Sequence, residues 1–207
     1  QCGRLGLPAQ VTALAPVSGE VQKAGLLCSV QRCLVKSVKP EIYEKTSLSS
    51  VNLSAWELMM PRRESRIIKQ LEEVMCTEAP ISRSLLINRI FDAYGVLRKT
   101  ARLIVWMDSI LDKTPYYKQD IDGLIFYWNT KEDAESYTGF RVDSKREAVD
   151  LPPREVANAV RSILEQQAAL PLADLMRVTA RLLGFSRFGL NVETAMRRGV
   201  QILLDGE

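Results

Sequence analysis

Residues 81–111 read ISRSLLINRIFDAYGVLRKTARLIVWMDSIL, and this stretch decides the fold. Ser82 is placed to cap a helix whose apolar side chains recur at helical spacing. Gly95 follows at the position where helices commonly end in a left-handed residue. A second amphipathic helix is predicted from Thr100 to Leu111. Two helices joined by a short turn predict a helix-turn-helix.

The flanking sequence extends this pair into a mainly α-helical protein with a small β-hairpin. A preceding helix is predicted from Pro61 to the residues before Pro80. Two segments after the pair, Leu124–Trp128 and Tyr137–Val142, are predicted strands, and the polar stretch between them, residues 129–136, is predicted to be the hairpin loop. Three helices followed by a hairpin is the order of a winged helix. We therefore expect a winged-helix-like domain over residues 61–150.

Three further helices are predicted after Asp150, and we expect them to form an HTH-like C-terminal three-helix unit, residues 151–207, packed on that domain. A shift of 89 residues aligns the two parts, pairing Gly95 with Gly184 and Arg98 with Arg187. This echo has two explanations: tandem helix-turn-helix units, or the general likeness of helical hairpins that end in glycine. Residues 1–60 are expected to be a connector or a partly extended region.

Composition excludes most catalytic chemistry. The 207 residues include 28 Lys and Arg against 25 Asp and Glu, a net charge of +3, and no histidine. Ser-His and Cys-His dyads and His-ligated zinc are therefore excluded. The chain also has no Gly-x-x-x-x-Gly-Lys-Ser/Thr phosphate loop. We predict no catalytic residue, no metal, no cofactor and no small-molecule substrate, and so a chain that is not an enzyme.

The sequence predicts neither a membrane-spanning segment nor a disulfide framework. No apolar run reaches the roughly 18 residues that a membrane span needs. Four scattered cysteines predict free thiols in a reducing compartment: Cys2, Cys28, Cys33 and Cys76. We expect a cytoplasmic protein without membrane contact. Because the chain begins with Gln1, we expect it to be part of a longer polypeptide.

Six short motifs occur in a characteristic order. They are Glu78-Ala-Pro-Ile81, Leu85…Arg89-Ile90…Tyr94-Gly95…Arg98, Phe126-Tyr127-Trp128, Phe140-Arg141-Val142, Leu151-Pro-Pro-Arg-Glu-Val156 and Arg181-Leu-Leu-Gly-Phe-Ser-Arg187. Over about residues 64–205 this order resembles the domain of unknown function at the C-terminal end of very large bacterial proteins. Those proteins contain a superfamily-1 helicase and, in many cases, a Vsr-like endonuclease module.

The resemblance implies a kind of parent polypeptide and its partners, but no active site. The parent is a polypeptide that translocates on or cuts nucleic acid, including in defence against foreign DNA. The implied partners are DNA, duplex or single strand, and the helicase and nuclease modules of the same polypeptide. The chain would then be their non-catalytic nucleic-acid-binding accessory domain.

Six cations are the candidate nucleic-acid-binding residues: Arg98, Lys99, Arg102, Arg187, Arg197 and Arg198. The first three stand at the start of the second helix of the helix-turn-helix, where the positive helix end favours phosphate contacts. The other three occupy the matching place in the C-terminal unit. The alternative is a solvated helix start whose cations pair with Asp92 or Asp108. A further basic group, residues 62–66, either adds to this surface or is linker charge.

The sequence also favours a second function. Residues 119–150, which include the predicted hairpin, or wing, contain eight acidic and four basic side chains. A wing with this net negative charge would be repelled by a phosphate backbone. The alternative is therefore a protein–protein interaction or structural module that docks on the helicase or nuclease domains. Among the aromatic residues, only Tyr127 is kept as a base-stacking candidate, because alternation places it opposite Phe126 and Trp128.

Overall fold

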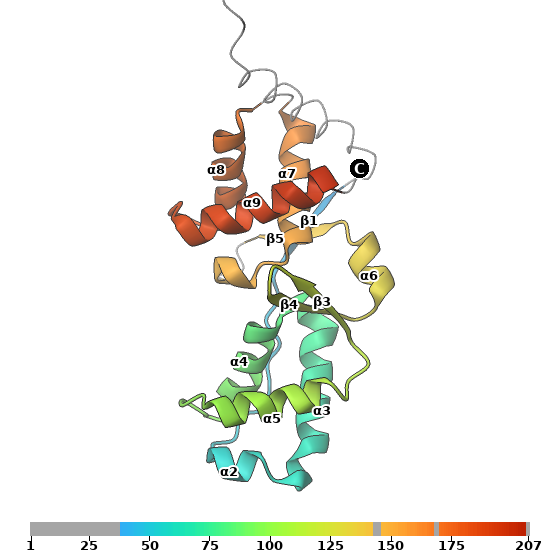
Figure 1. Ribbon diagram of the computed structural model, residues 1–207, viewed down its shortest axis with the longest axis vertical. Helices are drawn as coiled ribbons and strands as arrows, with labels where there is room; N and C mark the ends of the chain where they lie inside the picture. The colour runs from blue at the N-terminus through green and yellow to red at the C-terminus, as the bar shows by residue number, and fades with distance from the viewer. Residues whose placement is uncertain (1–37, 143–145, 168–169, 206–207) are drawn as a thin grey trace, which may run out of the picture.

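The computed structural model describes residues 38–142, 146–167 and 170–205, which form a mainly helical protein with two small sheets (Figure 1). The helices in these ranges are α2 Ala55–Leu58, α3 Pro61–Glu78, α4 Arg83–Ala93, α5 Ala101–Leu111, α6 Lys131–Ser136, α7 Pro153–Gln166, α8 Leu172–Leu182 and α9 Leu190–Asp205, with a 3-10 turn, η1, at Ala148–Asp150. The strands are β1 Lys39–Ile42, β2 Ile81–Ser82, β3 Tyr117–Ile121, β4 Leu124–Trp128 and β5 Gly139–Val142. None of the described helices is both long and apolar enough to cross a bilayer.

The lower core lies among α3, α4 and α5. Each helix contributes fully buried apolar side chains, such as Leu71, Leu86 and Leu103. The predicted helix starts are confirmed, because the Ser82 hydroxyl accepts the Leu85 N–H at 3.0 Å and the Thr100 hydroxyl accepts the Leu103 N–H at 3.3 Å. The part of the fold that periodicity predicts is thus the part built from amphipathic helices.

The predicted hairpin between Leu124–Trp128 and Tyr137–Val142 is wrong. β4 pairs with β3 on one side and with β2 on the other, in the antiparallel order β2-β4-β3. The β3–β4 turn is Asp122-Gly123, with φ of 53° and 76°. An Asp-Gly pair favours this tight turn because both positions need a positive φ. The hairpin therefore spans residues 117–128.

The loop predicted for residues 129–136 is also wrong, because Lys131–Ser136 form α6. Thr130 and Asp133 make a capping box: the Asp133 N–H donates to the Thr130 hydroxyl at 3.1 Å, and the Thr130 N–H donates to the Asp133 carboxylate at 3.2 Å. α6 turns the chain away from the three-stranded sheet. β5 then pairs in parallel with β1, from Lys39 opposite Gly139 to Ile42 opposite Val142.

The described part of the N-terminal region joins the folded body. Besides β1, it supplies Leu58, which is fully buried in the lower core. The Val51 and Leu53 N–H groups donate to the Ala93 and Tyr94 carbonyls at 2.8 and 3.0 Å. The rest of the expected connector, residues 1–37, lies outside the described residues.

The upper core lies among α7, α8 and α9 (Figure 1). α7 and α9 approach closely at Gly199, where an added Cβ would lie 2.4 Å from Val156 Cγ1. The sequence similarity at a shift of 89 residues corresponds to similar C-terminal ends of α4 and α8. The Val96 N–H donates to the Phe91 carbonyl, and the Phe185 N–H to the Ala180 carbonyl, both at 2.9 Å. A glycine of positive φ precedes each donor, as in a Schellman motif.

Buried ion pairs join the two cores. The Glu155 carboxylate on α7 is fully buried and accepts hydrogen bonds from Arg141 and Arg146. Arg141 also donates to the Glu78 and Pro80 carbonyls at 2.7 and 2.6 Å, just where α3 ends and β2 begins. The buried Glu78 carboxylate in turn pairs with Arg89 of α4 at 2.7 Å. One continuous polar network therefore connects α7 to α3 and α4.

Replacing Glu155 with Gln should destabilise the protein strongly. The change removes the charge that two buried guanidinium groups share, and breaking a buried pair in this way costs about 3–5 kcal/mol. Urea unfolding at neutral pH measures the loss. Glu193→Gln is the matched control, because its exposed pair with Arg197 contributes less than about 1 kcal/mol. Equal losses in the two variants would contradict the assigned role of Glu155.

Stability should also fall in acid through this carboxyl. Burial would raise the pKa of Glu155, but attraction to Arg146 and Arg141 and their hydrogen bonds outweigh it and lower the pKa from 4.5 to about 2. A carboxyl with a lowered pKa stabilises the fold above pH 4.5, and this contribution is lost as the pH falls from 4.5 towards 2. The urea midpoint of the wild type should therefore drop more steeply over this range than that of Glu155→Gln. Parallel pH profiles would show that Glu155 has no such pKa.

Candidate nucleic-acid interface

The connector between α4 and α5 fixes the place of the first three candidate cations. Gly95, with φ of 65°, ends α4, and Val96 turns back into the lower core with 7% of its surface exposed. The next four residues, 97–100, are exposed and lead to the N-terminus of α5. The cations at 98, 99 and 102 therefore surround the first turn of α5, where free backbone N–H groups favour an anion.

Two of these cations have no acidic partner. Arg98 and Arg102 are exposed, and neither forms an ion pair or a hydrogen bond with any residue that the structure describes. Lys99 donates to the side-chain oxygen of Asn88. The alternative pairing with Asp108 is not formed, because both Asp108 oxygens bind Arg83 at 2.5 and 2.6 Å. Asp92 makes no ion pair within the described ranges either.

Beyond Arg102, the outward face of α5 carries both apolar and polar side chains: Val105 and Ser109 are exposed, and Asp108 is partly exposed in its pair with Arg83. Val105 is 67% exposed, and Leu97 in the connector is 96% exposed. Trp106 and Ile104 are partly buried against the lower core. A ligand of this helix would thus meet cations at its N-terminus and both aliphatic and polar side chains further on.

The second group of candidate cations lies elsewhere. Figure 1 shows α5 below the β2-β4-β3 sheet and α9 above it, so the two groups do not meet in one stripe. Arg197 pairs with Glu193 at 2.5 Å, and Arg198 pairs with Asp122 of the β3–β4 turn at 3.1 Å. Arg187 is exposed in the α8–α9 connector. Two of these three arginines therefore already hold acidic partners.

The acidic residues counted between 119 and 150 are spread over separate elements. Asp120 and Asp122 belong to the hairpin, three others lie on α6, Glu147 and Asp150 lie at η1, and Asp143 falls outside the described residues. Asp122 is bound by Arg198 of α9. Tyr127, the aromatic kept as a stacking candidate, is 3% exposed and packs in the lower core, so it is not accessible to a base.

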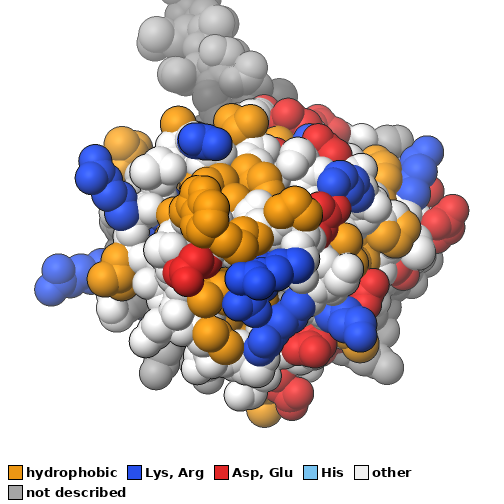
Figure 2. Space-filling view, turned by 90° about the horizontal axis from the view of Figure 1, so that it is seen from below, with side chains coloured by type: hydrophobic (Ala, Val, Ile, Leu, Met, Phe, Trp, Pro, Cys, Tyr) orange, Lys and Arg blue, Asp and Glu red, His pale blue; other side chains and the backbone are white. Residues whose placement is uncertain are grey.

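An exposed tryptophan is absent from the residues predicted from the sequence. Trp56 on α2 is 67% exposed. The signal for α2 is the pattern Ser54-Ala-Trp-Glu57, a capping box in which the Glu57 N–H donates to the Ser54 hydroxyl. Figure 2 shows this end of the molecule from below: hydrophobic side chains gather at its centre, Lys and Arg side chains lie beside them, and acidic side chains are interspersed.

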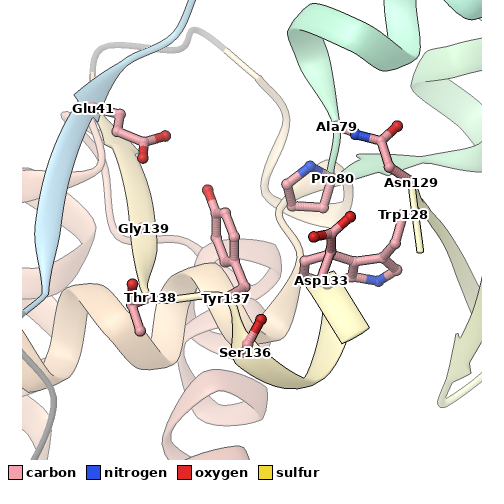
Figure 3. Close-up of a pocket in the computed structure, with 10 residues that line it drawn as sticks. All are labelled: Glu41, Ala79, Pro80, Trp128, Asn129, Asp133, Ser136, Tyr137, Thr138 and Gly139. Carbon is pink, nitrogen blue, oxygen red and sulfur yellow. The ribbon is translucent and has the colours of Figure 1, made fainter. Parts of the chain in front are cut away.

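A small polar hollow lies between α6, β1 and the end of β4 (Figure 3). Its volume is about 360 Å³, and its walls include the carboxylates of Glu41 and Asp133 and the rings of Trp128 and Tyr137. The Tyr137 hydroxyl is shielded from solvent and forms no hydrogen bond with the part of the chain that the structure describes. Burial is the main reason that the pKa of Tyr137 is raised. Within the described ranges no cluster of Cys, Asp or Glu has the arrangement of a metal site.

A comparison with protein families finds a match over part of the chain. A family described as a protein of unknown function (DUF3320) matches residues 57–104, from α2 through the first turn of α5. The chain is thus similar to a domain of unknown function over the segment that forms α3, β2, α4 and their connector. No curated protein and no solved structure matches the chain.

Gly95 should be needed to present the connector. Its φ of 65° strains any other L residue, and an added Cβ would lie 2.4 Å from the Asn52 side-chain oxygen. Gly95→Ala should therefore lower the free energy of unfolding by about 1–2 kcal/mol, measured with urea. At Gly189, ahead of α9, an added Cβ meets no atom within 4 Å, and Gly189→Ala should change stability by less than about 0.5 kcal/mol. A neutral Gly95→Ala would mean that the connector is not fixed at this residue.

Proposed function

We propose that residues 61–128 form a winged helix whose α5 binds nucleic acid, within a non-catalytic accessory domain of a larger helicase or nuclease polypeptide. The observation that carries this proposal is the pair Arg98 and Arg102, exposed at the N-terminus of α5 and without acidic partners among the described residues. Cations placed at a positive helix end attract anions, and the phosphate backbone of a nucleic acid is such a ligand.

The order of elements supports the winged-helix part. The chain runs α3, β2, α4, α5, β3, β4, and the three strands associate in the order β2-β4-β3. In a helix-turn-helix the second helix, here α5, enters the groove with its N-terminal residues at the base edges. The β3–β4 hairpin takes the position of the wing.

The wing itself is not proposed as a DNA contact. Its turn residue Asp122 is tied to Arg198 of α9, and Asp120 adds a second negative charge. A phosphate backbone would be repelled by Asp120 and would have to displace Arg198. The proposed contact is therefore α5 together with its connector.

The larger setting rests on similarity. The match to a family of unknown function covers residues 57–104, which include α3, α4 and the connector with Arg98. The order of short motifs resembles the terminal domain of helicase and endonuclease polypeptides. On this proposal the motor and nuclease chemistry belongs to other modules, and this chain positions the nucleic acid for them.

A second function, docking on a protein partner, is favoured by one observation. Leu97 and Val105 expose 96% and 67% of their surfaces on the same side of the α4–α5 pair as the cations. Exposed aliphatic side chains of this size are typical of protein contacts when they form a patch. Such a partner would be a helicase or nuclease module of the same polypeptide.

The salt dependence of DNA binding tests the proposal. A labelled duplex is titrated with the full chain at two salt concentrations, with wild type and with Arg98→Ala combined with Arg102→Ala. Each phosphate contact contributes about 0.9 to the log–log slope, so losing two should lower the slope by about 2 and weaken binding at low salt. Arg177→Ala combined with Arg181→Ala is the control, because it removes the same charge from exposed positions on α8.

Two results would overturn the proposal. One is the absence of duplex binding by the wild type at low salt. The other is an equal loss in both double variants, which would show a response to net charge and not to α5. Capture of a helicase or nuclease module by the wild type, lost in Leu97→Ala, would support the docking function instead.

A further inference from the structure

We infer that the end of the molecule formed by α2, the start of α3 and the connector binds single-stranded nucleic acid, with an unpaired base stacked on Trp56. This surface, called here the α2 face, consists of Trp56, Arg62, Arg63, Leu97 and Arg98. The inference rests on the proposed function and narrows it: the preferred ligand is a duplex that continues into a single strand.

The backbone holds Trp56 outward. α2 is anchored by Leu58, which is fully buried in the lower core, and by the capping box between Ser54 and Glu57. Residues two apart on a helix point to opposite sides, so the burial of Leu58 turns Trp56 towards solvent. The result is an indole that is 67% exposed on an ordered helix. Tryptophan is enriched at interfaces, because its indole combines a large apolar face with a polar N–H.

The chain brings α2 beside the connector. Residues 51–53 run along residues 93–95, with the Leu53 N–H 3.0 Å from the Tyr94 carbonyl. The position of a Cβ at Gly95 is 2.4 Å from the Asn52 side-chain oxygen. Trp56 follows Leu53 by three residues, and Leu97 follows Tyr94 by three. The segment that leads into α2 therefore runs beside the segment that leads into the connector.

The charges of the α2 face suit phosphate. The nearest carboxylate, Glu57, is held by the Ser54 hydroxyl and N–H. These hydrogen bonds are the main reason that the pKa of Glu57 is lowered, and the Arg63 and Arg62 charges lower it further. Both arginines lie in the first turn of α3, which begins at Pro61, shortly after α2 ends at Leu58. Arg62 and Arg98 are exposed and form no ion pair within the described ranges. Figure 2 shows the hydrophobic centre of this end bordered by Lys and Arg side chains, with acidic side chains interspersed among them.

An exposed indole flanked by arginines favours an unpaired base. In a duplex the bases are stacked on both faces except at its two ends, so a single strand offers Trp56 many more free faces. Sequence-tolerant binding of single strands combines such a stacking side chain with a positively charged path for the backbone. A duplex bound at α5 would reach the α2 face through its single-stranded extension.

The experiment compares blunt and tailed ligands on the full chain. One ligand is a blunt duplex of about 16 base pairs, roughly one and a half turns. The others carry an additional tail of about six nucleotides, with either polarity and as DNA or RNA. The measured quantity is the ratio of the Kd for the blunt duplex to the Kd for the tailed duplex. For the wild type we expect a ratio of roughly five to a hundred with at least one tail.

Variants at Trp56 test whether the indole causes the tighter binding of the tailed duplex. Trp56→Ala should reduce the ratio to about one, and Trp56→Phe, which keeps an aromatic face, should retain most of it. Leu190→Ala is the control, because it removes an exposed aliphatic side chain, 78% exposed, from the start of α9. Its ratio should equal that of the wild type. Circular dichroism confirms that each variant is folded.

The outcomes separate this inference from the proposed function. A wild-type ratio of one, or a ratio retained in Trp56→Ala, overturns the inference and leaves duplex binding by α5 standing. Binding of tailed ligands and free single strands without binding of the blunt duplex supports the inference and overturns the duplex proposal. No binding of any of these ligands overturns both. Burial of Trp56 by a helicase or nuclease module without nucleic acid would assign the face to protein docking.

Discussion

The two cores of the structure are joined through the buried carboxylate of Glu155. Glu155, fully buried on α7, is bonded by Arg141 and Arg146, and Arg141 reaches on to the carbonyls of Glu78 and Pro80. The upper core of α7 to α9 and the lower core of α3 to α5 are separate clusters of apolar side chains. Removing two guanidinium groups from water is costly, so their positions are set by this carboxylate and these carbonyls. That geometry sets how the two cores meet, and leaves the α5 surface outside the junction.

Amphipathic helices were predictable because their periodicity is local. The starts of α4 and α5 follow from Ser82 and Thr100, and the left-handed ends of α4 and α8 follow from Gly95 and Gly184. Strand pairing was not predictable in the same way, because β1 and β5 are about a hundred residues apart in the chain. The predicted hairpin joins the aromatic segment 124–128 to the segment 137–142. The standard turn signal, Asp122-Gly123, instead joins it to the preceding strand, residues 117–121.

The candidate site was predictable in part. The sequence places cations at residues 98, 99 and 102, but it does not indicate which of them have acidic partners. Arg198 looks equivalent to these in sequence, yet it binds Asp122, a residue 76 positions away. Trp56 lies in a four-residue helix, too short for a periodic pattern, so only its capping box could have revealed it. Arg141 and Glu155 stand in two of the short motifs, and their burial turns apparent surface charge into a structural network.

On the proposed function, nucleic acid binds the lower end of the molecule, at α5 and α2, and not the C-terminal unit. Amide resonances of the isotope-labelled full chain, followed during titration with a tailed duplex, locate the binding surface. We expect chemical-shift changes at residues 55–63 and 95–106, with residues 184–198 unchanged. Changes centred on residues 184–198, or on the β3–β4 turn, would contradict this proposed binding surface.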